Sequence, residues 1–298
     1  MLFLKTSTGR VTPLFYFLTG AVLLSASPLC AIASQGALPP IPIVVTLPVL
    51  KTLTEKVGGR HVAVSSLITG LENEHTYTPR PSDIIALQKA RMLVKIGLGL
   101  EAWIDPLIKN ADRPTLLTVT TSQDVPLIHN NPHIWLDPER AKMMTHHITK
   151  GLSQIDPARQ AEFKNNEAAF ALALDTLTAE LTGKLKGIKN TKIITHHPAW
   201  PYFAKRFGFV IAGEIQAQAG SEPSAKRIGA LTRLMRREKI AVILSEPQLN
   251  SKMPQILAEE TGARIVRLSP MPIAPATEDY LDFIRYNVET LVAALQGH

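Results

Sequence analysis

Three histidines lie in segments whose neighbouring residues restrict the backbone. His133 follows an Asn-Pro pair and precedes an apolar run that ends at Asp137 and Pro138. Because an aspartate before a proline is typical of a helix N-cap and the first helical position, the backbone near His133 should be nearly fixed. His75 and His197 lie in comparable segments, the first after Asn-Glu and the second before Pro-Ala-Trp. Neutral imidazoles are the commonest metal ligands, so three that converge from loops predict a site for zinc or a similar ion.

The other histidines are predicted to have structural or surface roles. His146 and His147 are adjacent on a predicted helix and cannot face one ion together. His196 should point away from His197 if that segment is extended. His129 is kept only as a minor candidate for a second site.

The first 33 residues are predicted to be an export signal. Lys5 and Arg10 precede an apolar run, from 14 to 26, that is too short to span a bilayer comfortably. An Ala-Ile-Ala sequence ending at Ala33 predicts cleavage there and a periplasmic mature protein. An uncleaved signal, which would act as a membrane anchor, is the alternative.

The only cysteine, Cys30, lies within this segment. The residues before it, from 27 to 29, fit the small-residue pattern of a lipoprotein signal poorly, so lipid anchoring is not expected. After cleavage the chain would have neither a disulfide nor a thiolate ligand. Any metal must then be held by nitrogen and oxygen atoms.

The composition is that of a globular protein. The chain has 298 residues, of which 45% are hydrophobic and 19% charged, enough for two domains of ordinary size. The formal net charge is +7, but the basic residues are scattered and are not gathered into tracts with interleaved aromatic residues. This pattern argues against nucleic acid as a partner.

From residue 39 the chain alternates between β-branched runs and amphipathic segments. Strands are predicted at 41–47, 62–67, 92–96 and 116–119, separated by helices at 49–57, 83–89 and around Trp103. Repeated alternation predicts a parallel sheet flanked by helices, which is a fold of the α/β class. Ligands in such sheets bind at the carboxyl ends of the strands, and the loops carrying His75 and His133 should lie there.

An apolar stripe predicts one long helix in the middle of the chain. Its members recur every three, four or seven residues: Phe163, Phe170, Leu174, Leu177, Leu181, Leu185 and Ile188. About thirty residues would span roughly 45 Å, which is longer than one small lobe needs. Strands and helices then alternate again. We therefore predict an N-terminal lobe at 34–155, a rigid linking helix at 156–189 and a C-terminal lobe at 190–298. A metal bound by His197 and by ligands of the first lobe would bridge the cleft.

Six motifs occur in order between residue 40 and the C-terminus. They are Glu74–Asp83, Ala90–Trp103, Asn131–Pro138, His197–Ala204, Glu222–Ala225 and Ser245–Gln248. In these motifs the chain resembles the periplasmic metal-binding proteins of zinc and manganese ABC importers. The resemblance implies two lobes joined by a rigid helix and delivery of the ion, by a monomer that is not an enzyme, to a membrane permease. His75, His133 and His197 fall on the family's three histidine-ligand positions.

The chain departs from the family pattern at one ligand position. Where the family usually has an acid in a final Asp-Pro element, this sequence has Ser269. The fourth ligand is thus left to water, to Glu74, or to Ser269 acting through a water. Three histidines with water or one carboxylate suit Zn²⁺, whereas Mn²⁺ prefers more oxygen, so Zn²⁺ is the expected ion. The short segment 123–130 also lacks the long His-rich acidic loop often found in the zinc branch.

Other functions stay open at this point. A zinc ion with an open fourth position would suit a periplasmic hydrolase, in which Glu74 is the only sequence-adjacent candidate for the general base. The sequence contains no H-E-x-x-H, nucleophile-elbow or Ser-His-Asp signature that would favour this activity. A manganese- or iron-binding member of the same family and a surface adhesin that only stores metal are further alternatives.

Overall fold

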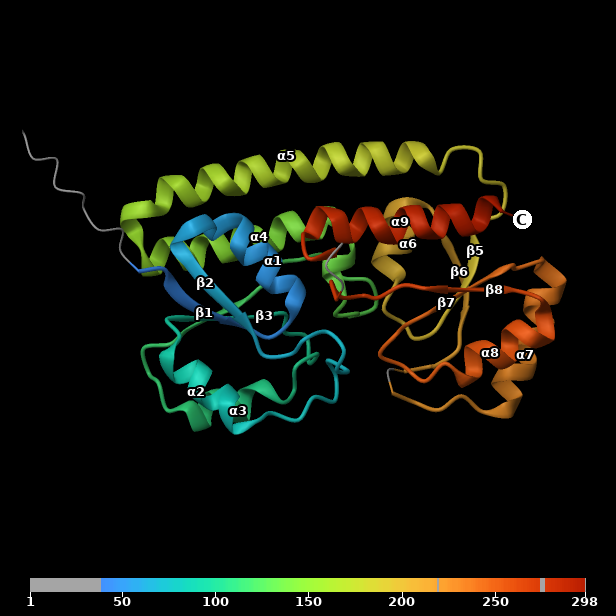
Figure 1. Ribbon diagram of the computed structural model, residues 1–298, viewed down its shortest axis with the longest axis horizontal. Coiled ribbons are helices and arrows are strands. Elements are labelled where there is room, and N and C mark those ends of the chain that lie inside the picture. The colour runs from blue at the N-terminus through green and yellow to red at the C-terminus, as the bar shows by residue number, and fades with distance from the viewer. Residues whose placement is uncertain (1–38, 219, 274–276, 298) are drawn as a thin grey trace, which may run out of the picture. The chain divides into compact units, whose positions relative to one another are not determined.

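The computed structural model describes residues 39–218, 220–273 and 277–297, all within one compact unit that begins at Pro39 (Figure 1). The predicted export signal, its cleavage site and Cys30 lie outside the described residues. Among the helices of the described ranges, none combines the length and the apolar character needed to cross a membrane.

The first half of the unit contains a parallel sheet of four strands. These are β1 (Ile41–Val45), β2 (Val62–Ser66), β3 (Met92–Lys95) and β4 (Leu117–Thr120), in the order β2-β1-β3-β4. Successive residues of β1 enter different cores, since Ile43 and Val45 belong to one hydrophobic cluster and Val44 to another. Burial on both faces explains why the two central strands, β1 and β3, are nearly continuous apolar runs in the sequence.

Helices cover both faces of this sheet. One face carries α2 (Pro81–Lys89) and α3 (Ile104–Ala111), and the other carries α1 (Pro48–Gly58) and α4 (Pro138–Ile155) (Figure 1). A glycine permits the close approach of α4, because a Cβ atom at Gly151 would lie 2.6 Å from Val119 and 2.8 Å from Met92. The loops that follow β2 and β4 leave the sheet at its carboxyl edge.

The second half repeats this arrangement. Strands β5 (Lys192–Thr195), β6 (Val210–Glu214), β7 (Val242–Ser245) and β8 (Arg264–Arg267) form a parallel sheet in the order β6-β5-β7-β8. Its helices are α6 (Pro201–Phe207), α7 (Ala225–Glu238), α8 (Lys252–Thr261) and α9 (Tyr280–Gln296). The predicted α/β class, with two parallel sheets flanked by helices, is therefore confirmed.

A long helix, α5 (Gln160–Lys184), runs past both halves (Figure 1). Its 25 residues correspond to about 37 Å. The stripe from Phe163 to Leu181 is buried and packs against α1, α4 and α9. Leu185 and Ile188 continue the apolar period beyond the helical end, where the chain turns through Gly187 with a φ of 94°. The lobe boundaries given above remain a prediction.

The two halves are joined by packing and by polar contacts. One hydrophobic cluster contains residues of both sheets, for example Val45 and Leu244. Asp137 at the start of α4 is paired with Arg206 of α6, with Oδ1 at 2.5 Å from Nε. The Tyr202 hydroxyl donates to the carbonyl of Asn131 at 2.6 Å. These contacts cross from one half to the other and join the two halves.

Candidate metal centre

The three predicted histidines come from three loops at the carboxyl ends of strands. His75 lies between β2 and α2, and His133 lies between β4 and the short 3₁₀ turn η2 (Ile134–Leu136) that precedes α4. His197 follows β5 directly. Because parallel strands present their carboxyl ends at one edge, the two sheets bring these loops together. Glu74, one of the three candidates for the fourth ligand, precedes His75 in the same loop.

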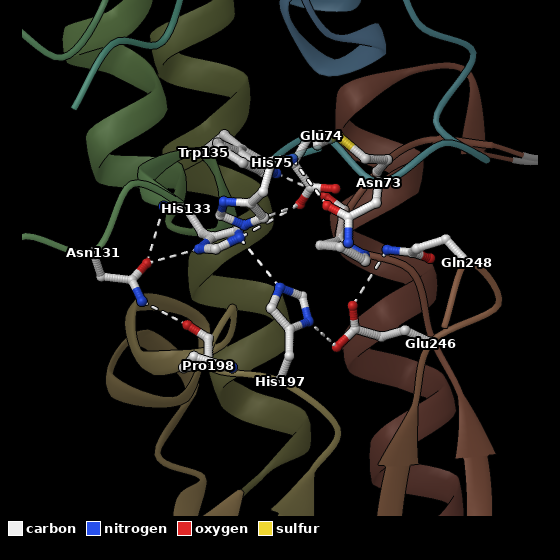
Figure 2. A network of polar contacts seen from close by, with 12 residues as sticks. Asn73, Glu74, His75, Asn131, His133, Trp135, His197, Pro198, Glu246 and Gln248 are labelled. Atoms are coloured by element: carbon white, nitrogen blue, oxygen red, sulfur yellow. Dashed lines mark hydrogen bonds and ion pairs between the residues drawn. The ribbon is translucent and has the colours of Figure 1, made fainter. Parts of the chain in front are cut away.

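The four side chains converge on one point (Figure 2). The Nε2 atoms of His133 and His197 are 3.3 Å apart, and Oε1 of Glu74 is 3.5 Å from Nε2 of His133. Nε2 of His75 is 4.0 Å from the same oxygen, and the potential ligand atoms all lie within 4.8 Å of one another. In a tetrahedral zinc site with bonds of 2.0–2.1 Å, the ligand atoms are about 3.3–3.4 Å apart. The cluster therefore needs only a small contraction to hold such an ion.

Two atoms of the cluster are buried without a hydrogen-bond partner. Among the described residues, Oε1 of Glu74 and Nε2 of His75 have no such partner. Buried polar atoms are nearly always satisfied, so an unpaired acceptor on each of two neighbouring side chains calls for a ligand. A metal ion among the four atoms would satisfy both.

Hydrogen bonds orient two of the imidazoles (Figure 2). Nδ1 of His133 is 2.9 Å from Oδ1 of Asn131, which also accepts the backbone N–H of His133. Nδ1 of His197 is 2.7 Å from Oε1 of Glu246. When Nδ1 donates its hydrogen to these oxygens, the Nε2 lone pair of each imidazole points toward the cluster. In many metal sites the ligand histidines are oriented in this way by a hydrogen-bond acceptor behind the ring.

The charge states also favour cation binding. Burial, together with the neighbouring His133, lowers the pKa of His75 to about 4, and burial likewise lowers the pKa of His133. Both imidazoles are then neutral at neutral pH. Burial alone would raise the pKa of Glu74, but a His133 that carries a proton on Nε2 outweighs it, through a hydrogen bond and its charge, and holds the pKa of Glu74 at about 2. Burial alone would lower the pKa of His197, but the Glu246 carboxylate outweighs it and raises that pKa.

Sequence reasoning identified the cluster residues but not the role of Asn131. The available signal was the Asn-x-His spacing, because an Asn side chain commonly accepts the backbone N–H two residues later. Glu246, which lies in the motif Ser245–Gln248, has His197 as a partner, with its Oε1 2.7 Å from Nδ1 of His197. The hydroxyl of Ser269 accepts the backbone N–H of Met271 at 3.0 Å, which is a local turn contact.

The histidines predicted to have other roles lie in other contacts. Nδ1 of His146 is 2.9 Å from Glu167, and Nε2 of His147 is 2.8 Å from the carbonyl of Gln123. His196 is buried, with 1% of its surface exposed, but it is not one of the four residues whose potential ligand atoms converge.

Comparison with known proteins agrees with this geometry. A family described as "Zinc-uptake complex component A periplasmic" matches residues 43–294. The zinc-binding lipoprotein AdcA of Streptococcus pneumoniae is 26% identical over 273 residues, which cover 84% of this chain and 54% of the relative. The chain thus spans about half the length of AdcA. The iron-binding protein YfeA of Yersinia pestis is 26% identical over 266 residues, covering 86% and 85% of the two chains. A crystal structure of ZnuA superposes with a TM-score of 0.79 at 29% identity and covers 86% of this chain and 99% of that one.

Proposed function

The chain belongs to the family of periplasmic A components of zinc-uptake complexes, and on this premise we propose that it is an exported binding protein that captures Zn²⁺. Its ligands are His75, His133, His197 and Glu74, and the ion passes from this site to the permease of an ABC importer. The observation that carries the proposal is the convergence of one buried carboxylate oxygen and three imidazole nitrogens within 4.8 Å.

The ligand types favour zinc over the other ions of the family. Three nitrogen atoms and one oxygen match the tetrahedral preference of Zn²⁺, whereas Mn²⁺ prefers more oxygen ligands. Since the YfeA relative is named as an iron-binding protein, Fe²⁺ is the competitor to include beside Mn²⁺ in every binding test.

Binding rather than catalysis is supported by the position of Glu74. A catalytic zinc site keeps one coordination position open for water, and its general base stands beside that position. With Glu74 as the fourth ligand, the open position is filled and the only sequence-adjacent base is engaged. Hydrolysis of model esters that requires Glu74 would contradict this assignment.

Calorimetric titration of the metal-stripped exported chain with Zn²⁺, Mn²⁺ and Fe²⁺ tests the proposal. We expect one tight zinc site and much weaker manganese binding, because the donor set holds a single oxygen. Ser269→Asp should raise zinc affinity by less than about tenfold, since four ligands are already present. If zinc bound tightly only in Ser269→Asp, the natural site would be incomplete and the proposal wrong.

Uptake by cells separates transport from storage. Deletion of the gene is expected to slow growth under zinc limitation and to lower the accumulation of radioactive zinc, and added zinc should restore growth. An adhesin that only stored metal would leave both unchanged. Complementation with a His133→Ala copy is the matched control, because that chain is exported but lacks one ligand.

Zinc affinity should fall as the pH decreases through the titration of His197. The pKa of this residue is raised, so in mild acid zinc must displace a proton from it. His75, whose pKa is about 4, and His133, whose pKa is also lowered, stay neutral over most of this range. Below the raised pKa of His197, we expect zinc affinity to fall by about tenfold per pH unit, measured by competition with a chelator of known affinity. A slope near three decades per unit would show that all three imidazoles titrate together.

The two halves should close only slightly around the ion. The shared core, the Asp137 pair with Arg206, and the hydrogen bond from Trp135 Nε1 to the Pro270 carbonyl at 2.6 Å already join them. We expect small-angle scattering to show a change in radius of gyration below about 1 Å on zinc binding, as in preorganised complexes. The loops near Glu74 and Ser269 should carry most of the movement, and hydrogen exchange can locate it. A large compaction would contradict a rigid connection.

A further inference from the structure

Glu246 is positioned behind His197 by the register of two neighbouring strands. Strand β7 pairs with β5 in parallel, with Thr195 opposite Leu244. His197 and Glu246 follow two residues later on their respective segments, so their side chains lie on the same face of the sheet edge. Glu246 is 1% exposed, and its Oε1 is 2.7 Å from Nδ1 of His197 (Figure 2).

Among the residues that the structure describes, no lysine or arginine is paired with this carboxylate, and His197 is its only titratable partner. His133, by contrast, is held by the neutral amide of Asn131. A buried carboxylate without a counter-charge is unfavourable, so a cation at the cluster is the group that would balance it.

The charges of the cluster support the same conclusion. A divalent ion held by Glu74 and three neutral imidazoles retains one uncompensated positive charge in a buried site. Glu246 supplies a second negative charge, one imidazole away. We propose that Glu246 is a positioning residue that fixes Nε2 of His197 toward the ion and, together with Glu74, neutralises the two charges of the ion. This inference rests on the proposed zinc-binding function.

A purely structural role is the competing explanation. Oε1 of Glu246 also accepts the indole N–H of Trp200 at 3.1 Å, and Oε2 accepts the side-chain amide of Gln248 at 3.3 Å. If Glu246 only tied these loops together, removal of the Trp200 contact would weaken zinc binding as much as removal of the charge. Trp200→Phe tests this, because it deletes the indole N–H while keeping an aromatic ring in the core.

The experiment compares Glu246→Gln with Glu214→Gln and Trp200→Phe in the full exported chain. Glu214 is the control carboxylate, since it ends β6 on the other side of β5 and is half-buried, whereas Glu246 is fully buried. Zn²⁺ affinity is measured by chelator competition, the visible absorption of bound Co²⁺ reports ligand geometry, and melting of the metal-free chains reports folding. We expect Glu246→Gln to lower zinc affinity by about 10- to 100-fold and to alter the Co²⁺ spectrum, with both controls within about threefold.

The outcomes separate this inference from the proposed function. If the wild-type chain bound zinc tightly and Glu246→Gln kept that affinity and the Co²⁺ spectrum, only the role of Glu246 would be wrong. An equal loss in Trp200→Phe or in Glu214→Gln would also overturn it. If the wild-type chain bound no zinc, both proposals would fall. Should Glu246→Gln fail to fold, Glu246→Asp decides, because a shorter carboxylate must still lower zinc affinity by at least about threefold.

Discussion

His133→Ala is expected to lower zinc affinity by about 100- to 1,000-fold. Four-ligand zinc sites in small domains have apparent binding free energies of about 10–16 kcal/mol, so one ligand accounts for about 3–4 kcal/mol. His133 is 2% exposed, and its Nε2 is 3.3 Å from Nε2 of His197 and 3.5 Å from Oε1 of Glu74. Removal of the His133 imidazole leaves a void at the centre of the cluster. It also removes the hydrogen bond between Nδ1 of His133 and Oδ1 of Asn131.

Calorimetry and chelator competition measure this loss, and His147→Ala is the control. His147 is also a histidine of the α4 region, but its Nε2 contacts the carbonyl of Gln123, outside the cluster. It should bind zinc like the wild type. Equal affinities in His133→Ala and the wild type would place the zinc site elsewhere in the chain.

Asp137→Ala is expected to lower the free energy of unfolding by about 3–5 kcal/mol. Asp137 is 2% exposed and pairs with Arg140 and Arg206, and it accepts the backbone N–H of Glu139 as the N-cap of α4. The variant leaves two guanidinium groups without their partner and removes the cap. Because Arg206 belongs to α6, the change also weakens the junction of the two halves.

Urea unfolding of the metal-free chain measures the effect. Asp175→Ala is the matched control, since its exposed pair with Lys142 should contribute no more than about 1 kcal/mol. Asp137→Asn separates the two roles, because asparagine keeps the cap and loses the charge. A loss below about 1 kcal/mol in Asp137→Ala would show that the buried pairs only compensate for their own desolvation.

Most of the fold follows from local patterns in the sequence. The buried strands appear as runs such as that at Ile41, and α1, from Pro48 to Gly58, lies close to the predicted range 49–57. The end of α5 was harder to predict from the sequence. Leu185 and Ile188 continue the apolar period, although the helix ends at Lys184. A periodic pattern reports burial, and burial persists after helical hydrogen bonding has ended.

The site was only partly predictable for a different reason. His75, His133 and His197 could be recognised from the turns and prolines around them, which are local features. The contact between His197 and Glu246 depends on the order β6-β5-β7-β8, which makes β5 and β7 neighbours although a strand and two helices separate them in the chain. Strand order arises from packing of the whole sheet, so no spacing in the sequence could reveal this pair.

The proposed ligands are contributed by loops of both halves, since His75 follows a strand of one sheet and His197 follows a strand of the other. An unfolded chain therefore has no preformed pocket, since the four donor atoms meet only after both sheets have formed and docked. A polypeptide threaded through a secretion channel in extended form cannot carry zinc across with it. With the proposed ligands, zinc can therefore bind only in the compartment in which the chain completes its folding. It can bind there only after both sheets have formed correctly.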